Sequence, residues 1–350
     1  MSKPSLNENQ LRKYNVPKQT VEFRRPNYGK AITDGLTTVE VHPELLDMVS
    51  EMDPLSDLII PMHKFYLITK TEAPKWARRG KLIEYGWGSF KSILVMDIVQ
   101  PLFMSGVAPR KEENLSALKN AIREYAQSRG FISGFTRVDR RFIAWGDDRL
   151  FPFDTALVLG MEMDKELLEK VPTPGERLCD FEIYVKSGER VFDVARFIRG
   201  KGYRCFARVS FDGRVKYPPH AVTAGLGELG AQGVVITRQY GPRQRWCMIS
   251  IDADIIPDEP VDLGMAAYCD ACRICIRACP GGAIPEERLW WRGVKKRKIN
   301  DAKCYPFFKK LEGCGICLKV CPINRFGYED CISAFRRDGT ILGKTAVHVV

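Results

Sequence analysis

Long apolar runs and a hydrophobic N-terminus are both missing from this chain. No stretch of its 350 residues approaches the roughly 18 consecutive apolar residues that a membrane-spanning helix needs. The opening Met1-Ser-Lys-Pro-Ser-Leu-Asn-Glu has no apolar segment of the secretory type. The pair Arg24-Arg25 precedes Pro26-Asn-Tyr-Gly rather than the apolar run of a twin-arginine signal. We therefore expect no membrane span and a cytoplasmic protein, whose thiols stay reduced instead of forming disulfides.

The overall composition is that of a globular protein with an excess of basic residues. Hydrophobic residues make up 45% and charged residues 28% of the chain. A length of 350 residues suits one large domain with a small one, or two ordinary domains. The formal net charge of +11 leaves three interpretations open: nucleic-acid binding, an acidic electron donor, or a solvated basic face.

Eight of the twelve cysteines form two related runs. The first, Cys269-Asp-Ala-Cys272-Arg-Ile-Cys275-Ile-Arg-Ala-Cys279-Pro, has the C-x2-C-x2-C-x3-C-P spacing of bacterial ferredoxins. In that spacing three thiolates hold one [4Fe-4S] cluster and the fourth ligates a second cluster. The second run consists of Cys304 followed by Cys314-Gly-Ile-Cys317-Leu-Lys-Val-Cys321-Pro.

Crossed ligation predicts which thiolates share a cluster. The first set is Cys269, Cys272, Cys275 and Cys321, and the second set is Cys279, Cys304, Cys314 and Cys317. Zinc is the alternative, because C-x2-C pairs also serve structural zinc sites. Zinc does not need eight cysteines in two runs that each close with a proline, so we predict two [4Fe-4S] clusters and one-electron transfer.

The remaining cysteines are Cys179, Cys205, Cys247 and Cys331. Cys205 and Cys247 lie in apolar, strand-like runs, which predicts small core residues. None of the four has a neighbouring histidine that would indicate an activated nucleophile. The densest basic run, 292–298, lies between the two cysteine motifs, and we interpret it as a solvated loop beside anionic clusters.

Four regions follow one another along the chain. Residues 1–90 are proline-rich and irregular, which predicts an N-terminal extension wrapped over the core. We expect an α/β core over 91–262, a ferredoxin-like double [4Fe-4S] domain over 263–331 and a tail over 332–350.

Hydrophobic periodicity predicts the elements of the core. Helical spacing covers 115–126 with a stop at Gly130, and a second helix carries 191–198 and ends near 200–202. Apolar runs predict strands over 92–99, 156–161, 204–211, 233–237 and 246–251. The predicted fold class is α/β (α+β), with helices packed on a sheet.

A glycine-rich segment precedes the cysteines. Gly225-x-Gly227-x-x-Gly230 matches the dinucleotide-binding fingerprint letter for letter. That fingerprint must follow a strand and open a helix, whereas Tyr217-Pro-Pro-His220 stands before it and breaks a strand. A nicotinamide site is therefore not favoured. The density of glycine still predicts close backbone approach to something bulky, or a tight helix entry.

Several stretches together resemble the corrinoid-dependent reductive dehalogenases, which are related to the epoxyqueuosine reductases. The resemblance covers about residues 180–325 and rests on segments 195–203, 224–230, 240–245, 258–264 and 300–305 together with the cysteine runs. The epoxyqueuosine branch typically has a Gly-Trp-Ile-Gly-Lys-Asn-like stretch where this chain has Gly227-Glu-Leu-Gly-Ala-Gln. The dehalogenase branch therefore fits better.

The resemblance implies a nitroreductase-like core that binds base-off cobalamin and receives electrons from the two clusters in series. It implies a small-molecule substrate from which halide, or a comparable group, is removed. The electron donor would be an external low-potential protein of the ferredoxin or flavodoxin type, and we do not expect nucleic acid as a partner.

The resemblance also implies roles for individual residues. Tyr184 would donate the proton, and Arg245, or alternatively Arg243, would lower the pKa of its phenol. His220 would contact the corrinoid or support its site, since base-off binding needs no histidine on cobalt. The corrinoid-binding glycines would be Gly225, Gly227 and Gly230.

Two other classes of function stay open at this point. One is a tRNA-modifying enzyme of the epoxyqueuosine reductase type, which the charge of +11 allows. The other is an electron carrier or a corrinoid-reactivating protein without a reaction of its own.

Overall fold

The computed structural model describes residues 88, 91–92, 94–100, 114–143, 151–172, 175–212, 215–291, 294–311 and 313–344. The N-terminal extension predicted for 1–90 lies outside these residues, Gly88 excepted. Among the helices that are described, none combines the length and the apolar character that crossing a membrane requires.

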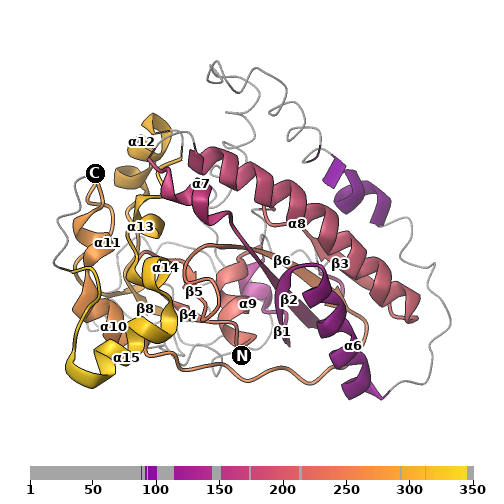
Figure 1. Ribbon diagram of the computed structural model, residues 1–350. Coiled ribbons are helices and arrows are strands. Elements are labelled where there is room, and N and C mark those ends of the chain that lie inside the picture. Colours follow the sequence, from indigo (N-terminus) through magenta and orange to yellow (C-terminus); the bar gives the residue numbers. More distant parts are fainter. Residues whose placement is uncertain are drawn as a thin grey trace, which may run out of the picture.

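A four-stranded antiparallel sheet forms the centre of the core (Figure 1). Its strands are β1 (Phe131–Arg137), β2 (Thr155–Glu162), β6 (Gln244–Ile251) and β3 (Cys205–Arg208), in that spatial order. The register pairs Met161 of β2 with Arg245 of β6. Every residue of β2 except Glu162 is buried, as expected for a strand covered on both faces.

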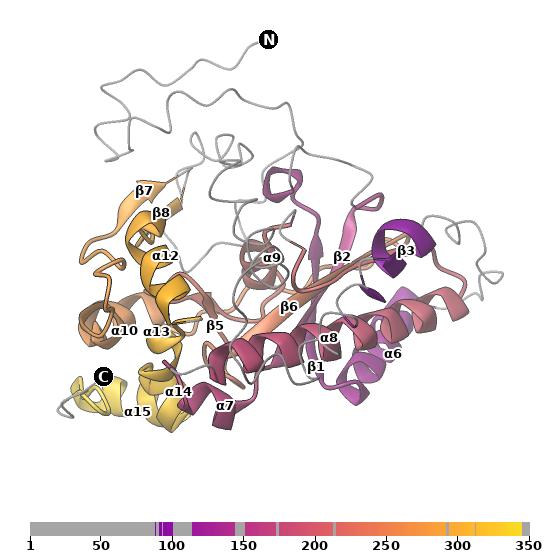
Figure 2. The same ribbon diagram turned by 90° about the horizontal axis from the view of Figure 1, so that it is seen from above.

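Helices cover both faces of this sheet (Figure 2). Helices α6 (Leu115–Ser128) and α8 (Gly175–Gly200) pack on one face, where Leu157 and Leu159 point. Helix α9 (Tyr217–Thr223) packs on the other, with Ala156 and Val158. The alternation along β2 follows from the two-residue period of a strand. The mixed helix-and-sheet fold predicted from the sequence is therefore confirmed.

Several predicted elements are present with different limits. Helix α6 begins after Asn114, whose side chain accepts a hydrogen bond from the Ser116 amide at 2.9 Å, and Gly130 follows its end with a φ of 82°. Helix α8 is much longer than the predicted 191–198. The predicted strand 204–211 is reduced to the four residues of β3.

The strand predicted over 92–99 is wrong. This segment is helical and includes a π-helical turn, Val95–Val99. The Gln100 side-chain amide exchanges two hydrogen bonds, of 2.9 and 2.8 Å, with the backbone of Ala207 on the edge strand β3. A continuous apolar run does not by itself distinguish a strand from a buried helix. Here the Gln100 side chain supplies hydrogen-bond partners for backbone groups at the edge of the sheet.

The segment between core and cysteines forms a small hairpin. Strands β4 (Glu228–Leu229) and β5 (Val235–Ile236) pair with each other, so the strand predicted over 233–237 lies outside the central sheet. Ala231 and Ile236 of this hairpin are buried in the same hydrophobic cluster as the first cysteines.

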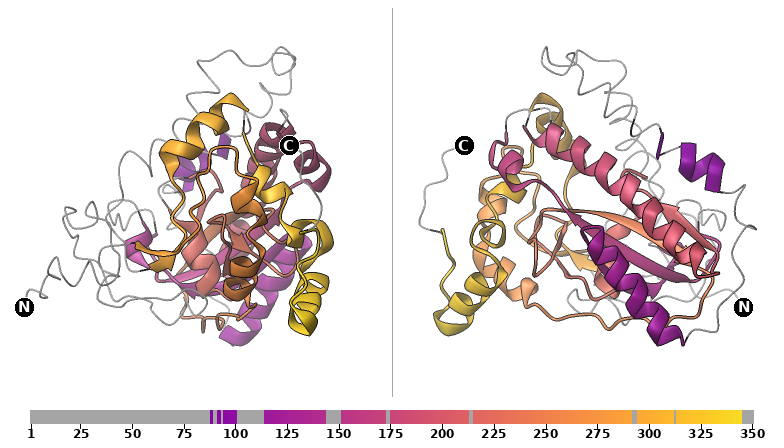
Figure 3. Two further views of the ribbon diagram at one scale, coloured as in Figure 1. Left: turned by 90° about the vertical axis from the view of Figure 1, so that its left-hand side faces the viewer. Right: turned by 45° about the vertical axis from the view of Figure 1, so that its right-hand side comes forward.

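Short helices carrying the cysteines gather at one end of the sheet (Figure 3). They are α10 (Met265–Cys272), α11 (Ile274–Arg277), α12 (Asp301–Lys310), α13 (Ile316–Lys319), α14 (Pro322–Phe326) and α15 (Tyr328–Asp338), with the hairpin β7 (Leu289–Trp291) and β8 (Val294–Lys296). Helix α15 continues through the boundary predicted at 331. It packs on α10, where the rings of Tyr268 and Phe335 lie 5.4 Å apart.

Candidate iron–sulfur centre and adjoining core

The first cysteine helix, α10, is held at its N-terminus by a buried glutamate. Gly264, with a φ of 72°, turns the chain into the helix. The Glu228 carboxylate, fully buried, accepts hydrogen bonds from the amides of Leu263 and Met265, the latter at 2.8 Å. A negative charge is favourable at this end of a helix. Burial nevertheless raises the pKa of Glu228 to about 7, against the lowering effect of the two amides.

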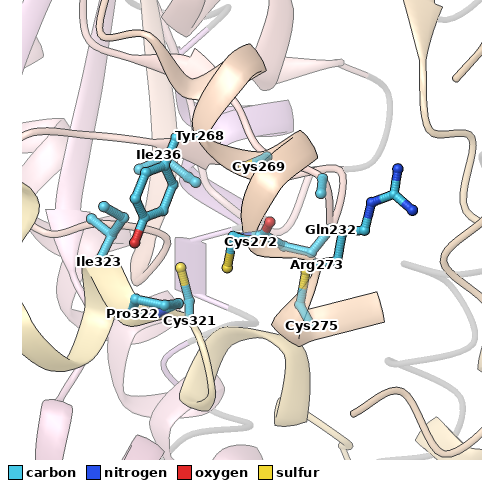
Figure 4. A pocket seen from close by; sticks show the side chains of 11 residues that line it. Gln232, Ile236, Tyr268, Cys269, Cys272, Arg273, Cys275, Cys321, Pro322 and Ile323 are labelled. Atoms are coloured by element: carbon cyan, nitrogen blue, oxygen red, sulfur yellow. The ribbon is translucent and has the colours of Figure 1, made fainter. Parts of the chain in front are cut away.

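Four thiols line one pocket (Figure 4). Cys269 and Cys272 come from α10, Cys275 from α11, and Cys321 immediately precedes α14. The rest of the lining is largely apolar and includes Ile236. The pocket therefore brings together the four cysteines that crossed ligation assigns to one cluster.

The electrostatics of this pocket suit a bound cluster. Burial raises the pKa of Cys269 to about 11 and raises the pKa of Cys275 and Cys321 further. The neighbouring thiols add to the effect, because a second thiolate in the same apolar space is repelled. Four thiolates in such a pocket need a compensating positive charge, and the iron atoms of a [4Fe-4S] cluster supply it.

The second set of cysteines is less buried. Cys279, Cys304, Cys314 and Cys317 are all partly exposed. The Asn300 amide donates to the Ala283 carbonyl at 2.8 Å, and the Ala283 amide donates to the Cys279 sulfur at 3.3 Å. These bonds join the Cys279 loop to the start of α12, which carries Cys304. The Cys317 thiol contributes to the raised pKa of Cys275, so the two sets adjoin each other.

Part of the basic run 292–298 is not the solvated loop that the sequence predicted. Arg297 is only 6% exposed, and its Nη1 forms a 2.7 Å ion pair with Asp270. Its positive charge partly opposes the effect of burial, which raises the pKa of the nearby Cys269 thiol. Arg297 is thus a buried cation beside the first set of cysteines.

The glycine-rich segment packs closely against other parts of the protein, and its predicted contact with a corrinoid stays a prediction. A Cβ on Gly225 would lie 2.3 Å from the Glu259 carbonyl oxygen, and one on Gly227 would lie 2.3 Å from the Ile236 carbonyl oxygen. A Cβ on Gly230 would lie 2.6 Å from the Gln232 side chain. The close backbone approach predicted from the glycines is present, and the groups that approach them belong to the protein itself. The segment connects α9 to β4, so it is also not the strand-to-helix turn of a dinucleotide site.

His220 is likewise occupied by the protein. It is 1% exposed, its Nε2 accepts a hydrogen bond from the Asp139 amide at 3.1 Å, and its Nδ1 lies 2.9 Å from the Lys216 carbonyl. A carbonyl only accepts, so Nδ1 carries the proton and the ring is neutral. With both nitrogens engaged by backbone, His220 supports the entry of α9, and its predicted role at a corrinoid site stays a prediction.

Tyr184 and Arg245 lie on the same face of the sheet. Tyr184 is in α8, in the cluster that also contains Cys247 and Ile249 of β6, and its ring meets Phe211 edge-on at 5.9 Å. Arg245 pairs with Asp180, which stands one helical turn before Tyr184. Sequence reasoning missed Asp180 because it recognised only the C-terminal part of this helix.

Arg243, the alternative cation, holds the two parts of the molecule together. Its Nε and Nη2 bind Glu162 Oε1 at 2.9 and 2.7 Å, and its Nη1 donates to Asn324 Oδ1 at 3.2 Å. Glu162 ends strand β2 and Asn324 lies in α14, three residues after Cys321. Arg243 therefore connects the sheet to the cysteine helices.

Three further residues at the first set of cysteines were missed, namely Glu228, Gln232 and Tyr268. Glu228 and Gln232 stand within or beside the glycine motif, and Tyr268 directly precedes Cys269. Their positions next to the cysteine and glycine motifs could have indicated these residues, but sequence position does not show which side chains face the pocket.

An α+β core joined to a two-cluster ferredoxin-type domain defines an iron–sulfur redox protein. Residues 268–325 match the family of 4Fe-4S dicluster domains, so the chain carries two [4Fe-4S] clusters. The individual ligand assignments remain predictions.

Comparison with individual proteins supports the resemblance found in the sequence. The chain is 31% identical over 183 residues to the tetrachloroethene reductive dehalogenase of Sulfurospirillum multivorans, covering 49% of this chain and 36% of that protein. It is 33% identical over 123 residues to the epoxyqueuosine reductase of Cyclobacterium marinum, covering 30% of this chain and 36% of the relative. The chain is thus a homologue of these reductases over part of its length, and spans about a third of the relatives' length.

The fold is also similar to a solved structure. The catabolic reductive dehalogenase NpRdhA superposes with a TM-score of 0.58 at 22% identity, over 68% of this chain and 37% of that one. At this identity the likeness concerns the fold.

Proposed function

We propose that the protein is an iron–sulfur and corrinoid-dependent reductase that removes halide from a small organic molecule, or cleaves a comparable bond. The observation that carries the proposal is the pocket of four thiols, built partly by the segment that leads into the core. In such a reaction the carbon–halogen bond is replaced by a carbon–hydrogen bond. Halide leaves, and two electrons and one proton are consumed.

The geometry offers a short connection from the pocket to the core. Ile236 of β5 lines the pocket. The carbonyl of the preceding Val235 accepts a 2.6 Å hydrogen bond from the side chain of Gln244, the residue before Arg245 in β6. Only a few packed residues therefore separate the first set of cysteines from the strand of Arg245.

A corrinoid enters the proposal through the homologues. One matched structure is described as suggesting a mechanism for B12-dependent dehalogenation. A bound corrinoid would supply a strongly reducing cobalt centre, the chemistry that side chains lack. Its contacts with Gly225, Gly227, Gly230 and His220 stay part of this proposal, although each of these residues also packs closely on the protein's own groups.

For the proton we propose Tyr184, with Arg245 beside it. The phenol O–H of Tyr184 is a proton donor of the kind that such a step needs. The ion pair with Asp180 anchors the Arg245 guanidinium one turn from Tyr184 on α8. A cation near the phenol stabilises the phenolate formed when the proton is given up.

We propose that electrons enter from an external low-potential ferredoxin or flavodoxin at the second set of cysteines. That set is partly exposed, whereas all four cysteines of the first set are buried. An acidic donor also suits a chain with a net charge of +11.

The second candidate is an epoxyqueuosine reductase-type activity, favoured by the 33% identity to the Cyclobacterium marinum enzyme. The third is an electron carrier or corrinoid-reactivating protein. One experiment separates the three. Anaerobically purified protein is reconstituted with iron, sulfide and cobalamin, and its visible spectrum, halide release from halogenated aromatic compounds and tRNA retention are measured.

Stoichiometric cobalamin with halide release that requires a reduced low-potential donor is the expected result. Salt-sensitive tRNA retention without halide release would favour the second candidate. Iron–sulfur absorbance alone, with no bound cobalamin, would overturn the proposal in favour of a carrier.

A further inference from the structure

Two buried polar groups at the pocket of the first cysteine set have no partner in good hydrogen-bond geometry, although the Tyr268 hydroxyl also interacts with the buried Cys331 thiol. Across the part of the chain that the structure describes, the buried side-chain atoms without a well-aligned hydrogen-bond partner are Arg129 Nε, Gln232 Nε2, Ser250 Oγ and the Tyr268 hydroxyl. Gln232 and Tyr268 line the pocket that holds the four thiols. A buried donor without an acceptor lowers the stability of the fold. Native proteins therefore rarely contain one unless a ligand or a water molecule accepts its hydrogen bond.

The hydroxyl of Tyr268 is held rigidly at this pocket. The residue is 1% exposed and directly precedes Cys269. Its ring is fixed edge-on against Phe335 of α15, at 5.4 Å between centroids. Figure 4 shows the hydroxyl on the side of the pocket where Cys321 and Pro322 lie. A phenol at neutral pH donates its proton to a hydrogen bond.

The amide of Gln232 reaches the pocket from the glycine-rich segment. The residue is 6% exposed, and its side chain crosses over Gly230, where a Cβ would come within 2.6 Å of its oxygen. The adjacent Ala231 already places its backbone amide in a hydrogen bond with the Cys269 thiol. A side chain at position 230 would crowd this amide, so glycine there leaves room for Gln232 at the pocket.

We propose that the Tyr268 hydroxyl and the Gln232 amide donate hydrogen bonds to sulfur atoms of the cluster held by the first cysteine set and raise its reduction potential. The proposal rests on the two-cluster assignment. The reduced cluster carries one more negative charge, so a donor stabilises it more than the oxidised cluster. Burial opposes reduction for the same electrostatic reason, and the two donors offset it.

This arrangement sets the order of electron flow. The second set of cysteines is partly exposed and receives electrons first, and the buried first cluster, with the higher potential, collects them beside the core. The end of the glycine-rich segment then serves the first cluster, through Ala231 and Gln232.

The test is a potentiometric titration of the anaerobic protein, followed by electron paramagnetic resonance. Tyr268→Phe and Gln232→Leu should each lower one of the two midpoints, roughly tenfold in the one-electron equilibrium or about 59 mV, and leave the other unchanged. The matched control is Ser250→Ala, which removes a buried hydroxyl that also lacks a partner but lies in strand β6. It should change neither midpoint.

A second measurement compares the unaltered protein with Tyr268→Phe. Resonance Raman spectra after reconstitution in D₂O should show an isotope shift of the iron–sulfur stretches that is reduced in Tyr268→Phe. Unchanged midpoints in both variants would overturn the proposal, because the two groups would then have no effect on the cluster. Loss of iron from either variant would also overturn it, because that group would then be needed for the fold or for cluster binding. A wild-type protein without cluster signals would instead contradict the two-cluster assignment itself.

Discussion

Arg245 on strand β6 forms an ion pair with Asp180 on helix α8, one turn before Tyr184. The pair crosses from the sheet to the helix that covers it, so it fixes both the guanidinium and the register of α8. The side chains of Asp180 and Arg245 are 8% and 20% exposed, which makes the pair more than a surface contact.

The first prediction concerns this relationship. Tyr184→Phe keeps the ring that meets Phe211 but removes the hydroxyl. Turnover should fall by roughly 10²–10⁴-fold, the usual effect of losing a positioned general acid, while cofactor loading survives. The matched control is Tyr203→Phe, another buried tyrosine of the same core, which should retain full turnover. Full turnover of Tyr184→Phe would contradict the role, and loss of cobalamin would make Tyr184 a binding residue.

Iron content tests the assignment of ligands. Wild-type protein should hold about eight iron atoms per chain. Cys275→Ala should lose the first cluster and Cys314→Ala the second, each leaving roughly half of the iron because each removes one of four thiolate ligands. Cys205→Ala, which changes a buried core cysteine instead, should keep all the iron. Zinc in place of iron on elemental analysis would refute the assignment.

Gly227 should matter for the first cluster pocket. In Gly227→Ala the new Cβ would meet the Ile236 carbonyl oxygen at 2.3 Å, so the hairpin β4–β5 must shift. Ile236 lines the cluster pocket, and we expect lower iron content with a loss of about 1–3 kcal/mol of stability, typical of overpacking. Gly200→Ala, where nothing lies within 4 Å, is the control. Intact iron with loss of cobalamin would instead support the corrinoid contact predicted from the sequence.

Glu228 should make stability depend on pH. Burial raises its pKa in the folded protein from 4.5 to about 7, so between these values the folded state binds more protons than the unfolded state. Its contribution to stability is therefore fully present below pH 4.5 and is lost as the pH rises through 7. Thermal unfolding of the anaerobic holoprotein between pH 5 and 8 should show this decline. The decline should be smaller in Glu228→Gln; equal slopes in both proteins would show that Glu228 does not titrate there.

Local patterns in the sequence were sufficient for features that depend on near neighbours. Cys269, Cys272 and Cys275 lie close together in sequence with the spacing of a cluster motif, so the motif is visible without tertiary structure. Helix α6 follows from its apolar spacing and from Gly130, because periodicity and a left-handed stop are local properties.

Segments whose environment is made by distant residues were predicted less well. The run 92–99 has the apolar character of a strand, yet Gln100 pairs with Ala207, more than one hundred residues away, and the segment is a helix. Gly225 and Gly227 correctly indicated close approach, but only the fold shows that the approaching groups are Glu259 and Ile236.

The sequence by itself therefore determined the kind of cofactor, because iron–sulfur ligation depends on cysteines a few residues apart. Only the tertiary structure decided which other groups meet it. Gln232, Tyr268 and Cys321 come from three separate segments, and they converge because burying their apolar neighbours folds those segments around one pocket. The pair of Asp180 and Arg245 arises in the same way, from packing α8 across β6. Burial is a property of the whole chain, so it selects contacts that no local pattern specifies.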